Sequence, residues 1–316
     1  MKMKRLIGTL TCTLILSAFH SCNSGVFIED IRPSEDNIEL DGNGDSVTIH
    51  FNSSNWEIIS GECSLTQAFF KIYNAEGVNI GTSGAPCLDG VGKIILNDEQ
   101  IDLTIERKHS KELTIKVDEN IMFSRFDLSI LVGNEYESKI IQVIISPCER
   151  YVLDDISYSL DAYEYYGNGV GYGKSITVNN ETSTPLTTTI YPFRNIYHEV
   201  TFTSLSPLAF WLLEKNTVVD IPTIVDKSLV MDGVRASYTG DEQKIPISFA
   251  NEEKKVTIPA LSKQRITPIL SYDWFETDFT IRAHNPKTNK KRTIAGRLRS
   301  NMPTKESHII RETIEE

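Results

Sequence analysis

Polar and apolar residues alternate over short runs along most of this chain, with a period of two. Such alternation places successive side chains on opposite faces of a strand, and Gly, Pro, Asn and Asp separate the runs as turn formers do. Only residues 207–215 have the composition of a short helix. The alternating runs are residues 46–51, 113–117, 126–132 and 140–145 in the first half, and 175–178, 199–203, 255–258 and 279–283 in the second.

Many short strands spaced by turns predict an all-β fold and not a parallel sheet with crossover helices. The length of the chain beyond its first residues suits two domains. We therefore expect two immunoglobulin-like β-sandwiches in tandem, at residues 27–148 and 149–302. A C-terminal tail at residues 303–316 would follow the last strand and could dock on a partner protein.

The chain begins with the layout of an export signal. Lys2, Lys4 and Arg5 precede an apolar run at residues 6–19, which is too short to cross a membrane as a helix. No later stretch reaches 18 apolar residues, so the sequence predicts no other membrane-spanning helix.

The AFHSC sequence at residues 18–22 resembles a bacterial lipobox, in which the cysteine becomes the lipidated first residue. The resemblance implies a signal peptide at residues 1–21, lipidation at Cys22 and a linker at residues 22–26. It further implies an exported protein that is lipid-anchored to the bacterial outer membrane, on the periplasmic face or at the cell surface. Simple cleavage and release is the alternative.

The charge of the chain disfavours nucleic acid as a partner. Loss of residues 1–21 would take the formal net charge from −11 to −14, and an acidic body repels phosphate backbones. The only sustained basic run, residues 287–299, is interpreted as a solvated hairpin.

Three cysteines remain if Cys22 carries lipid, so at most one disulfide can form among them. An exported location permits disulfides, and Cys63 with Cys87 is the preferred pair, which leaves Cys148 over. None of the spacings is C-x-x-C, and the histidines form no H-x-x-x-H motif, so the sequence predicts no metal site.

Two motifs are similar to catalytic or phosphate-binding loops, but each lacks residues that the chemistry requires. Residues 166–175, YGNGVGYGKS, end like a phosphate-binding loop, but the first required glycine falls on Asn168. The flanking sequence is too polar for a buried parallel strand, so we interpret the segment as a glycine-rich hairpin or loop. GTSGAP at residues 81–86 is similar to the nucleophile loop of serine proteases, but no Asp lies between His50 and Ser83 to complete a triad, so we interpret it as a turn. We therefore expect no enzymatic activity and no cofactor.

Two pieces of the N-terminal half resemble a BACON domain, an immunoglobulin-like sandwich of exported bacterial lipoproteins and glycan enzymes. These pieces are residues 33–58 and 112–146, and Trp56, Asn120 and Arg125 carry the resemblance within a span of about 120 residues. The resemblance implies either carbohydrate binding or a spacer role. Trp56 is then a sugar-stacking platform or a core residue at one end of the sandwich.

The second half contains a fainter resemblance to aerolysin-type β pore formers. Residues 175–204 supply an Asn- and Thr-rich strand start, and residues 255–270 supply a late V-x-I-P-x strand. The resemblance implies a pore-forming protein, which would need an amphipathic hairpin to insert.

Tyrosines crowd around the glycine-rich segment. Aromatic faces on a loop can stack on sugars, although alternating tyrosines also pack sheets. We predict a non-enzymatic envelope lipoprotein that binds carbohydrate or another surface. The alternatives are an accessory subunit of an envelope complex, with an envelope protein as its partner, and an aerolysin-like pore former. The predicted ligand-binding residues are Tyr163, Tyr165, Tyr166, Tyr172, Trp211 and Trp274.

Overall fold

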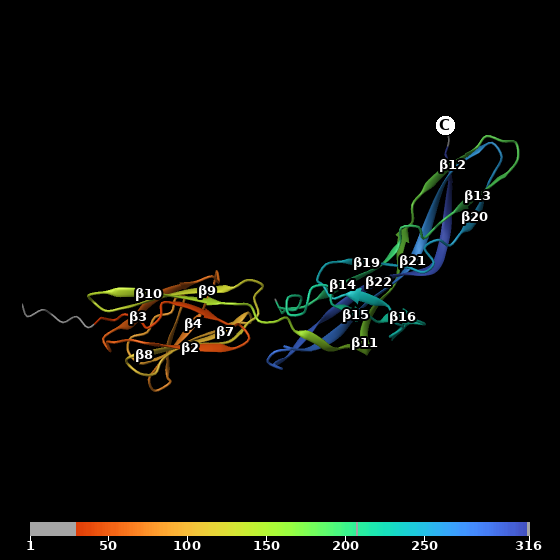
Figure 1. Cartoon of the computed structure of the whole chain (residues 1–316). Coiled ribbons are helices and arrows are strands. Elements are labelled where there is room, and N and C mark those ends of the chain that lie inside the picture. The colour runs from red at the N-terminus through yellow and green to blue at the C-terminus, as the bar shows by residue number, and fades with distance from the viewer. Residues whose placement is uncertain (1–29, 207, 315–316) are drawn as a thin grey trace, which may run out of the picture.

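The computed structural model describes residues 30–206 and 208–314, and these residues form strands and no helix. The predicted all-β class is confirmed (Figure 1). Within the described residues there is no helix with the length and apolarity that a bilayer crossing requires. The predicted signal peptide, the lipidated Cys22 and its linker lie outside the described residues.

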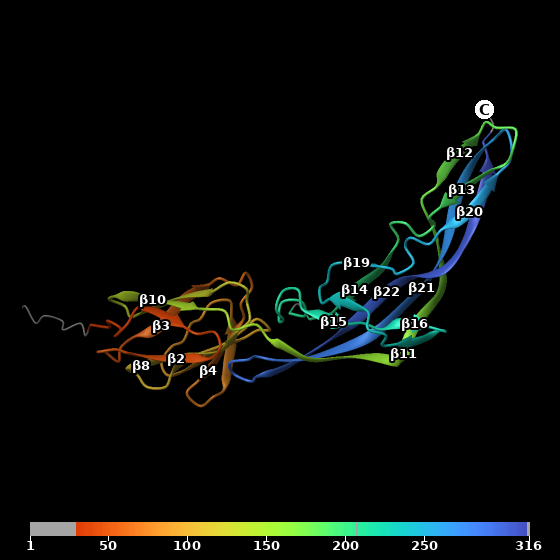
Figure 2. The ribbon, with the colours of Figure 1, turned by 45° about the vertical axis from the view of Figure 1, so that its right-hand side comes forward.

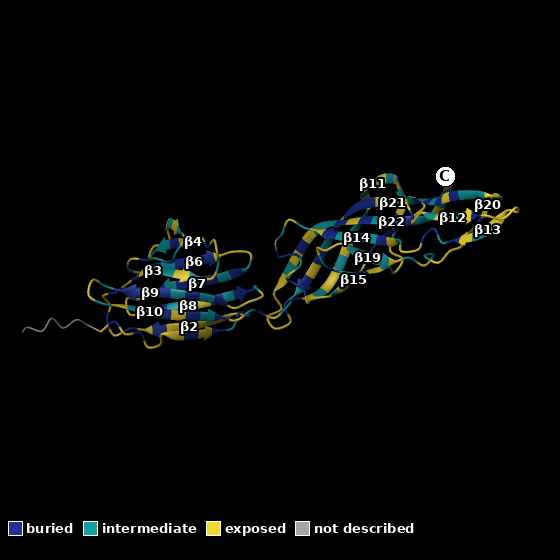
Figure 3. Cartoon of the chain, turned by 90° about the horizontal axis from the view of Figure 1, so that it is seen from above, coloured by how far each residue is buried: buried dark blue, intermediate teal, exposed yellow. Residues whose placement is uncertain are grey.

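Two sheets in the N-terminal half share one hydrophobic core. Alternate side chains of both sheets point into it, as Ile49, Ile115, Ile130 and Val143 do. Figure 3 shows buried positions interspersed with more exposed ones along these strands. The first sheet has the order β1 (Asn37–Leu40), β10 (Ser138–Ile145), β9 (Phe126–Gly133), β3 (Glu57–Cys63). The second has the order β2 (Asp45–His50), β8 (Glu112–Asn120), β7 (Ile101–Arg107), β6 (Gly92–Asn97), β4 (Phe70–Asn74), β5 (Asn79–Ser83).

Trp56 belongs to this core and is not a sugar platform. It is 4% exposed, its ring stacks on Phe51 with centroids 4.1 Å apart, and the Arg107 guanidinium lies 3.9 Å from its centroid. The predicted disulfide is not formed, since Cys63 and Cys87 are free thiols in the structure, as is Cys148.

The second half is built on one long sheet and differs from the predicted immunoglobulin-like sandwich. Its order is β11 (Val152–Tyr172), β21 (Ser262–His284), β22 (Lys291–Thr313), β14 (Tyr197–Thr203), β19 (Gln243–Pro246), and β12 (Ile176–Asn180) also pairs with β21. β21 and β22 have 23 residues each, which corresponds to roughly 75 Å of extended strand. The N-terminal half and this sheet lie end to end, with the C-terminus at the far end (Figures 1 and 2).

Two predictions about segments of this half are wrong. Residues 303–313 are not a tail, because they continue β22 and pair with β21. The glycine-rich segment is not a loop, because Gly169 and Gly171 lie in β11 opposite Tyr272 and Leu270. Register shifts between β11 and β21 mark irregularities that bend such long strands. The basic run at residues 287–299 does form the hairpin that was expected, at the turn between β21 and β22.

Three small sheets complete the second half. They are β13 (Leu186–Ile190) with β20 (Lys254–Ile258), β15 (Val218–Asp220) with β18 (Arg235–Ser237), and β16 (Thr223–Val225) with β17 (Ser228–Val230). The short helix expected at residues 207–215 is replaced by turns over residues 208–211 and an isolated bridge from Leu213 to Tyr151.

A buried carboxylate joins the two halves. Glu119, at the end of β8, accepts a hydrogen bond from the Tyr151 hydroxyl. It also forms ion pairs with Arg292 at 2.5 Å and with Lys290 at 2.9 Å. Burial alone would raise the pKa of Glu119, but hydrogen bonds from these three partners lower it overall. Glu119 therefore stays ionised and holds the β21–β22 turn against the N-terminal half.

Candidate functional site

Residues 201–242 form a single excursion from a pair of strands. β14 and β19 pair in antiparallel register up to Val200 opposite Gln243, so the chain leaves this pair and returns to the same point. Residues 201–203 still pair with β22 before the excursion departs from the sheet. This pair therefore holds the two ends of the excursion side by side.

Within the excursion, residues 216–238 form a two-stranded ribbon. β15 pairs with β18 and β16 pairs with β17, and Asp226 and Lys227 connect the inner strands. Both connecting residues have positive φ, 49° and 62°, as a two-residue hairpin turn of right-handed twist requires.

The backbone of the ribbon pairs with itself and not with the long sheet. Its four strands make ladders only with one another, and Ile221 N–H donates to Val234 O at 2.9 Å within it. Tyr238 N–H likewise donates to Thr217 O at 2.7 Å. The ribbon can therefore leave the sheet without breaking any ladder of the described strands.

Side chains hold the ribbon in place. Val219, Ile221 and Tyr238 join a core with Phe202 and Phe279 of the sheet. Near the turn, two ribbon side chains pack on Phe275 of β21, with the partly buried Tyr163 and Tyr165 of β11 around them; these two ribbon residues are Ile224 and Leu229. Two tyrosine hydroxyls of β11 also donate to ribbon carbonyls: Tyr158 to Asp220 at 2.9 Å, and Tyr163 to Lys227.

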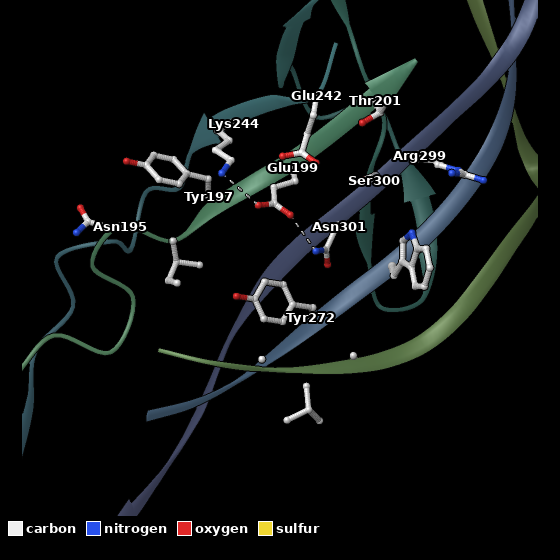
Figure 4. Close-up of a pocket in the computed structure, with 15 residues that line it drawn as sticks. Asn195, Tyr197, Glu199, Thr201, Glu242, Lys244, Tyr272, Arg299, Ser300 and Asn301 are labelled. Carbon is white, nitrogen blue, oxygen red and sulfur yellow. Dashed lines mark hydrogen bonds and ion pairs between the residues drawn. The ribbon is translucent and has the colours of Figure 1, made fainter. Parts of the chain in front are cut away.

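A groove of about 640 Å³ lies at the base of the excursion. β14 supplies Glu199, β19 supplies Lys244, β21 supplies Tyr272 and Trp274, and β22 supplies Asn301. Figure 4 shows Lys244, Glu199 and Asn301 linked in a chain, with the Tyr272 ring beside Asn301. The Lys244 Nζ–Glu199 Oε1 distance is 3.9 Å, and Asn301 Nδ2 donates to Glu199 Oε2 at 3.3 Å.

One wall of the groove is glycine backbone. A Cβ on Gly171 would lie 2.6 Å from Cε2 of Tyr272, so only glycine lets this ring rest against β11. Burial, with a smaller contribution from the Glu199 charge, raises the pKa of Tyr272 and keeps its hydroxyl protonated.

A buried histidine lies on the face of β14 opposite to the residues that line the groove. His198 of β14 is 3% exposed, and its Nε2 lies 2.7 Å from Ser300 Oγ, which is itself buried. Burial lowers the pKa of His198 to about 4, against a smaller opposing effect of Asp232 on the ribbon. The ring is therefore neutral at neutral pH.

The structure divides the six aromatic residues that the sequence singled out. Tyr166 and Trp274 meet, with ring centroids 4.9 Å apart, and Trp274 lines the groove. Tyr163 and Tyr165 pack beneath the ribbon instead, and Tyr165 donates to Asp273 at 2.7 Å. Tyr172 is 71% exposed on β11 away from the groove lining. Trp211 contacts Phe123 at 5.6 Å, near the junction of the two halves.

Sequence reasoning missed Glu199, Lys244, Tyr272 and Asn301. Tyr272 could have been found, because it stands two residues before Trp274 in a strand and so shares a face with it. The described residues contain no group of three or more His, Cys, Asp and Glu side chains that could hold a metal.

Comparison with known proteins gives only weak likenesses. No family model and no curated protein matches the chain, so the BACON resemblance gains no support. A solved lamprey immune protein has a TM-score of 0.39 at 13% identity, over 86% of this chain and 99% of that one. An aerolysin-like protein of Bombina maxima has 0.26 at 12% identity, over 50% and 97%. The β-pore-forming protein Mpp75Aa1.1 of Brevibacillus laterosporus has 0.24 at 12%, over 59% and 86%. Aerolysin-like and pore-forming proteins thus stand among the similar structures, but at these TM-scores they establish no family.

Proposed function

We propose that this chain is a non-enzymatic, exported protein that acts on membranes as a β pore former, with the excursion as its inserting segment. The observation that carries the proposal is the closure of residues 201–242 by the Val200–Gln243 pair. Release of the excursion from the sheet would place its ribbon, with the Asp226–Lys227 turn at the tip, beyond the end of the β14–β19 pair. The predicted lipid anchor at Cys22 would hold the chain at a membrane surface.

The dimensions of the ribbon suit a membrane crossing. Each arm, on either side of the Asp226–Lys227 turn, has about ten residues, and a transmembrane strand needs about 9–11. A paired hairpin also satisfies its backbone groups on the inner side, and neighbouring copies would satisfy the outer side.

Packing against the sheet would keep the ribbon docked in the absence of lipid. Release exposes at least four buried aliphatic side chains, at roughly 1.5–3 kcal/mol each, and these are Val219, Ile221, Ile224 and Leu229. The free chain therefore keeps the ribbon against the sheet. Insertion would bury Val219 and Ile221 in hydrocarbon, which would offset part of this cost.

Vesicle leakage tests the proposal. The processed chain, residues 22–316, is expected to release a trapped dye from phosphatidylcholine vesicles, with a rate that rises more steeply than in proportion to protein concentration, because several hairpins must associate. Bovine serum albumin at equal concentration provides the baseline. Dye retention across neutral and anionic vesicles, from pH 4 to pH 8, would remove the proposal.

A further inference from the structure

We propose that the groove at the base of the excursion binds a neutral saccharide, with Trp274 as the stacking platform and Glu199 as the main hydrogen-bond acceptor. This site lies on the long sheet and not on the N-terminal half. The inference does not depend on pore formation, because it concerns the free chain.

The aromatic side of the groove is built to receive a flat apolar surface. Trp274 is 44% exposed although it belongs to a paired strand, and Tyr166 covers part of its ring from outside the groove. A large aromatic side chain that is held in place and still open to solvent favours binding, because few of its rotamers remain to be lost. The C–H face of a pyranose ring is a surface of this kind.

The second ring of the groove is fixed by the backbone. Tyr272 stands two residues from Trp274 on the same strand. Its ring contacts Gly171 so closely that a Cβ at this position would clash with it. This contact holds the Tyr272 ring across β11 at one side of the groove. Because this wall is already ordered in the free protein, less conformational entropy is lost when a ligand binds.

The polar side offers acceptors and donors in alternation. The Glu199 carboxylate has about four acceptor positions, and its contacts to Lys244 and Asn301 are long, at 3.9 and 3.3 Å. Sugar hydroxyls can both donate to this carboxylate and accept from the Lys244 ammonium or the Asn301 amide. Hydrogen bonds to charged groups are the stronger ones, so Glu199 is expected to dominate.

The charge balance of the groove excludes an anion as its preferred ligand. Lys244 is paired with Glu199, and Arg299 Nε lies 2.6 Å from Glu276 Oε1 of the neighbouring strand. Neither cation is left to neutralise a phosphate or a sulfate, and Glu242 at the rim would repel one. A neutral polyhydroxylated ligand fits this arrangement best.

Isothermal titration of the processed chain with neutral trisaccharides of glucose, galactose, mannose and N-acetylglucosamine tests the site. At least one trisaccharide is expected to bind, and Trp274→Ala and Glu199→Gln should each weaken that binding at least tenfold. Gly171→Ala should weaken it by displacing Tyr272. Trp211→Ala is the matched control, since Trp211 is 40% exposed but lies near the junction of the halves, and it should bind as the wild type does.

Several outcomes would overturn the assignment. Silence toward all four trisaccharides would do so, as would unchanged binding by Trp274→Ala. Stronger binding of choline chloride or inorganic phosphate than of any trisaccharide would assign the groove to another ligand class. Circular dichroism melts verify that each variant is folded. Dye release is measured separately, so loss of saccharide binding and failure of pore formation remain distinguishable.

Discussion

Replacing Val230 with arginine is expected to slow dye release at least tenfold, whereas the same replacement at the adjacent Met231 leaves most of the release intact. The two residues stand at nearly the same depth on the same arm of the ribbon. Successive side chains of a strand point to opposite faces, so one would meet lipid and the other the water-filled side of a pore.

The composition of the two faces indicates which one would meet lipid and which one would line the pore. Thr223 pairs with Val230 near the turn, and Val219 pairs with Ala236 farther along the arms. The register shifts by two residues between these pairs, which keeps the side chains sorted into the same two faces. The Val230 face has Asp232 as its one charged side chain, while the Met231 face has the Asp220–Arg235 ion pair, at 3.4 Å in the free chain. The Val230 face consists of Val219, Ile221, Thr223, Val225, Ser228, Val230, Asp232, Val234 and Ala236.

An arginine on the lipid face costs about 2–4 kcal/mol per strand at the midplane of the bilayer and about 0–1 kcal/mol near its surfaces. Because the cost recurs in every copy that contributes to a pore, we expect the total to exceed the roughly 1.4 kcal/mol of a tenfold change. Val152→Arg provides a further control, because Val152 is 45% exposed on β11, outside the excursion. Equal loss of release in Val230→Arg and Met231→Arg, with both folded, would contradict the assignment of faces. Loss in Met231→Arg alone would reverse it.

The strands of the N-terminal half could be predicted from the sequence, because both of its sheets bury one face. β8, for example, alternates between buried and half-exposed residues over most of its length, and so it reads as a clean period of two. The length of β22 could not be predicted in this way. Its last residues, such as Lys305, Glu306 and Arg311, are exposed on both sides of the strand, so no alternation marks them.

The candidate site was harder to predict, because it depends on register and not on local sequence. Tyr166 and Trp274 were singled out as aromatic residues, and their rings do meet. The carboxylate that lines the groove with Trp274 is Glu199, which comes from a different strand, β14. Glu199 lies beside Asn301 only because β14 pairs with β22 in that register. A sequence shows which residues face one side of a strand, whereas the neighbour across the ladder is a property of the folded chain.

Acidification is expected to destabilise the long sheet through His198. The native pKa is about 4, against 6.5 for an unperturbed histidine. Between these values the unfolded chain binds a proton that the native chain does not, so the free energy of unfolding falls as the pH is lowered. The full difference amounts to about 3 kcal/mol, reached near pH 4, and none of it is present above pH 6.5.

Urea titrations followed by tryptophan emission, from pH 7.5 to pH 4, measure this effect. Carboxylates also titrate in this range, so the comparison is between the wild type and His198→Gln, which keeps a polar partner for Ser300 but does not titrate. The variant should lose less stability on acidification, by about 3 kcal/mol at the acid end. His308→Gln, which alters an exposed histidine of β22, should follow the wild type. Parallel curves for the wild type and His198→Gln would show that His198 is protonated in both states or in neither.

The position of His198 indicates which part of the structure loses stability first on acidification. The residue precedes Glu199 in β14, two positions before the Val200–Gln243 pair that closes the excursion, and its ring bonds Ser300 of β22. A charge forced onto this buried ring would act on the seam between β14 and β22. The strands that hold both ends of the excursion would therefore loosen before the N-terminal sandwich, which lies at the other end of the molecule and has a separate core.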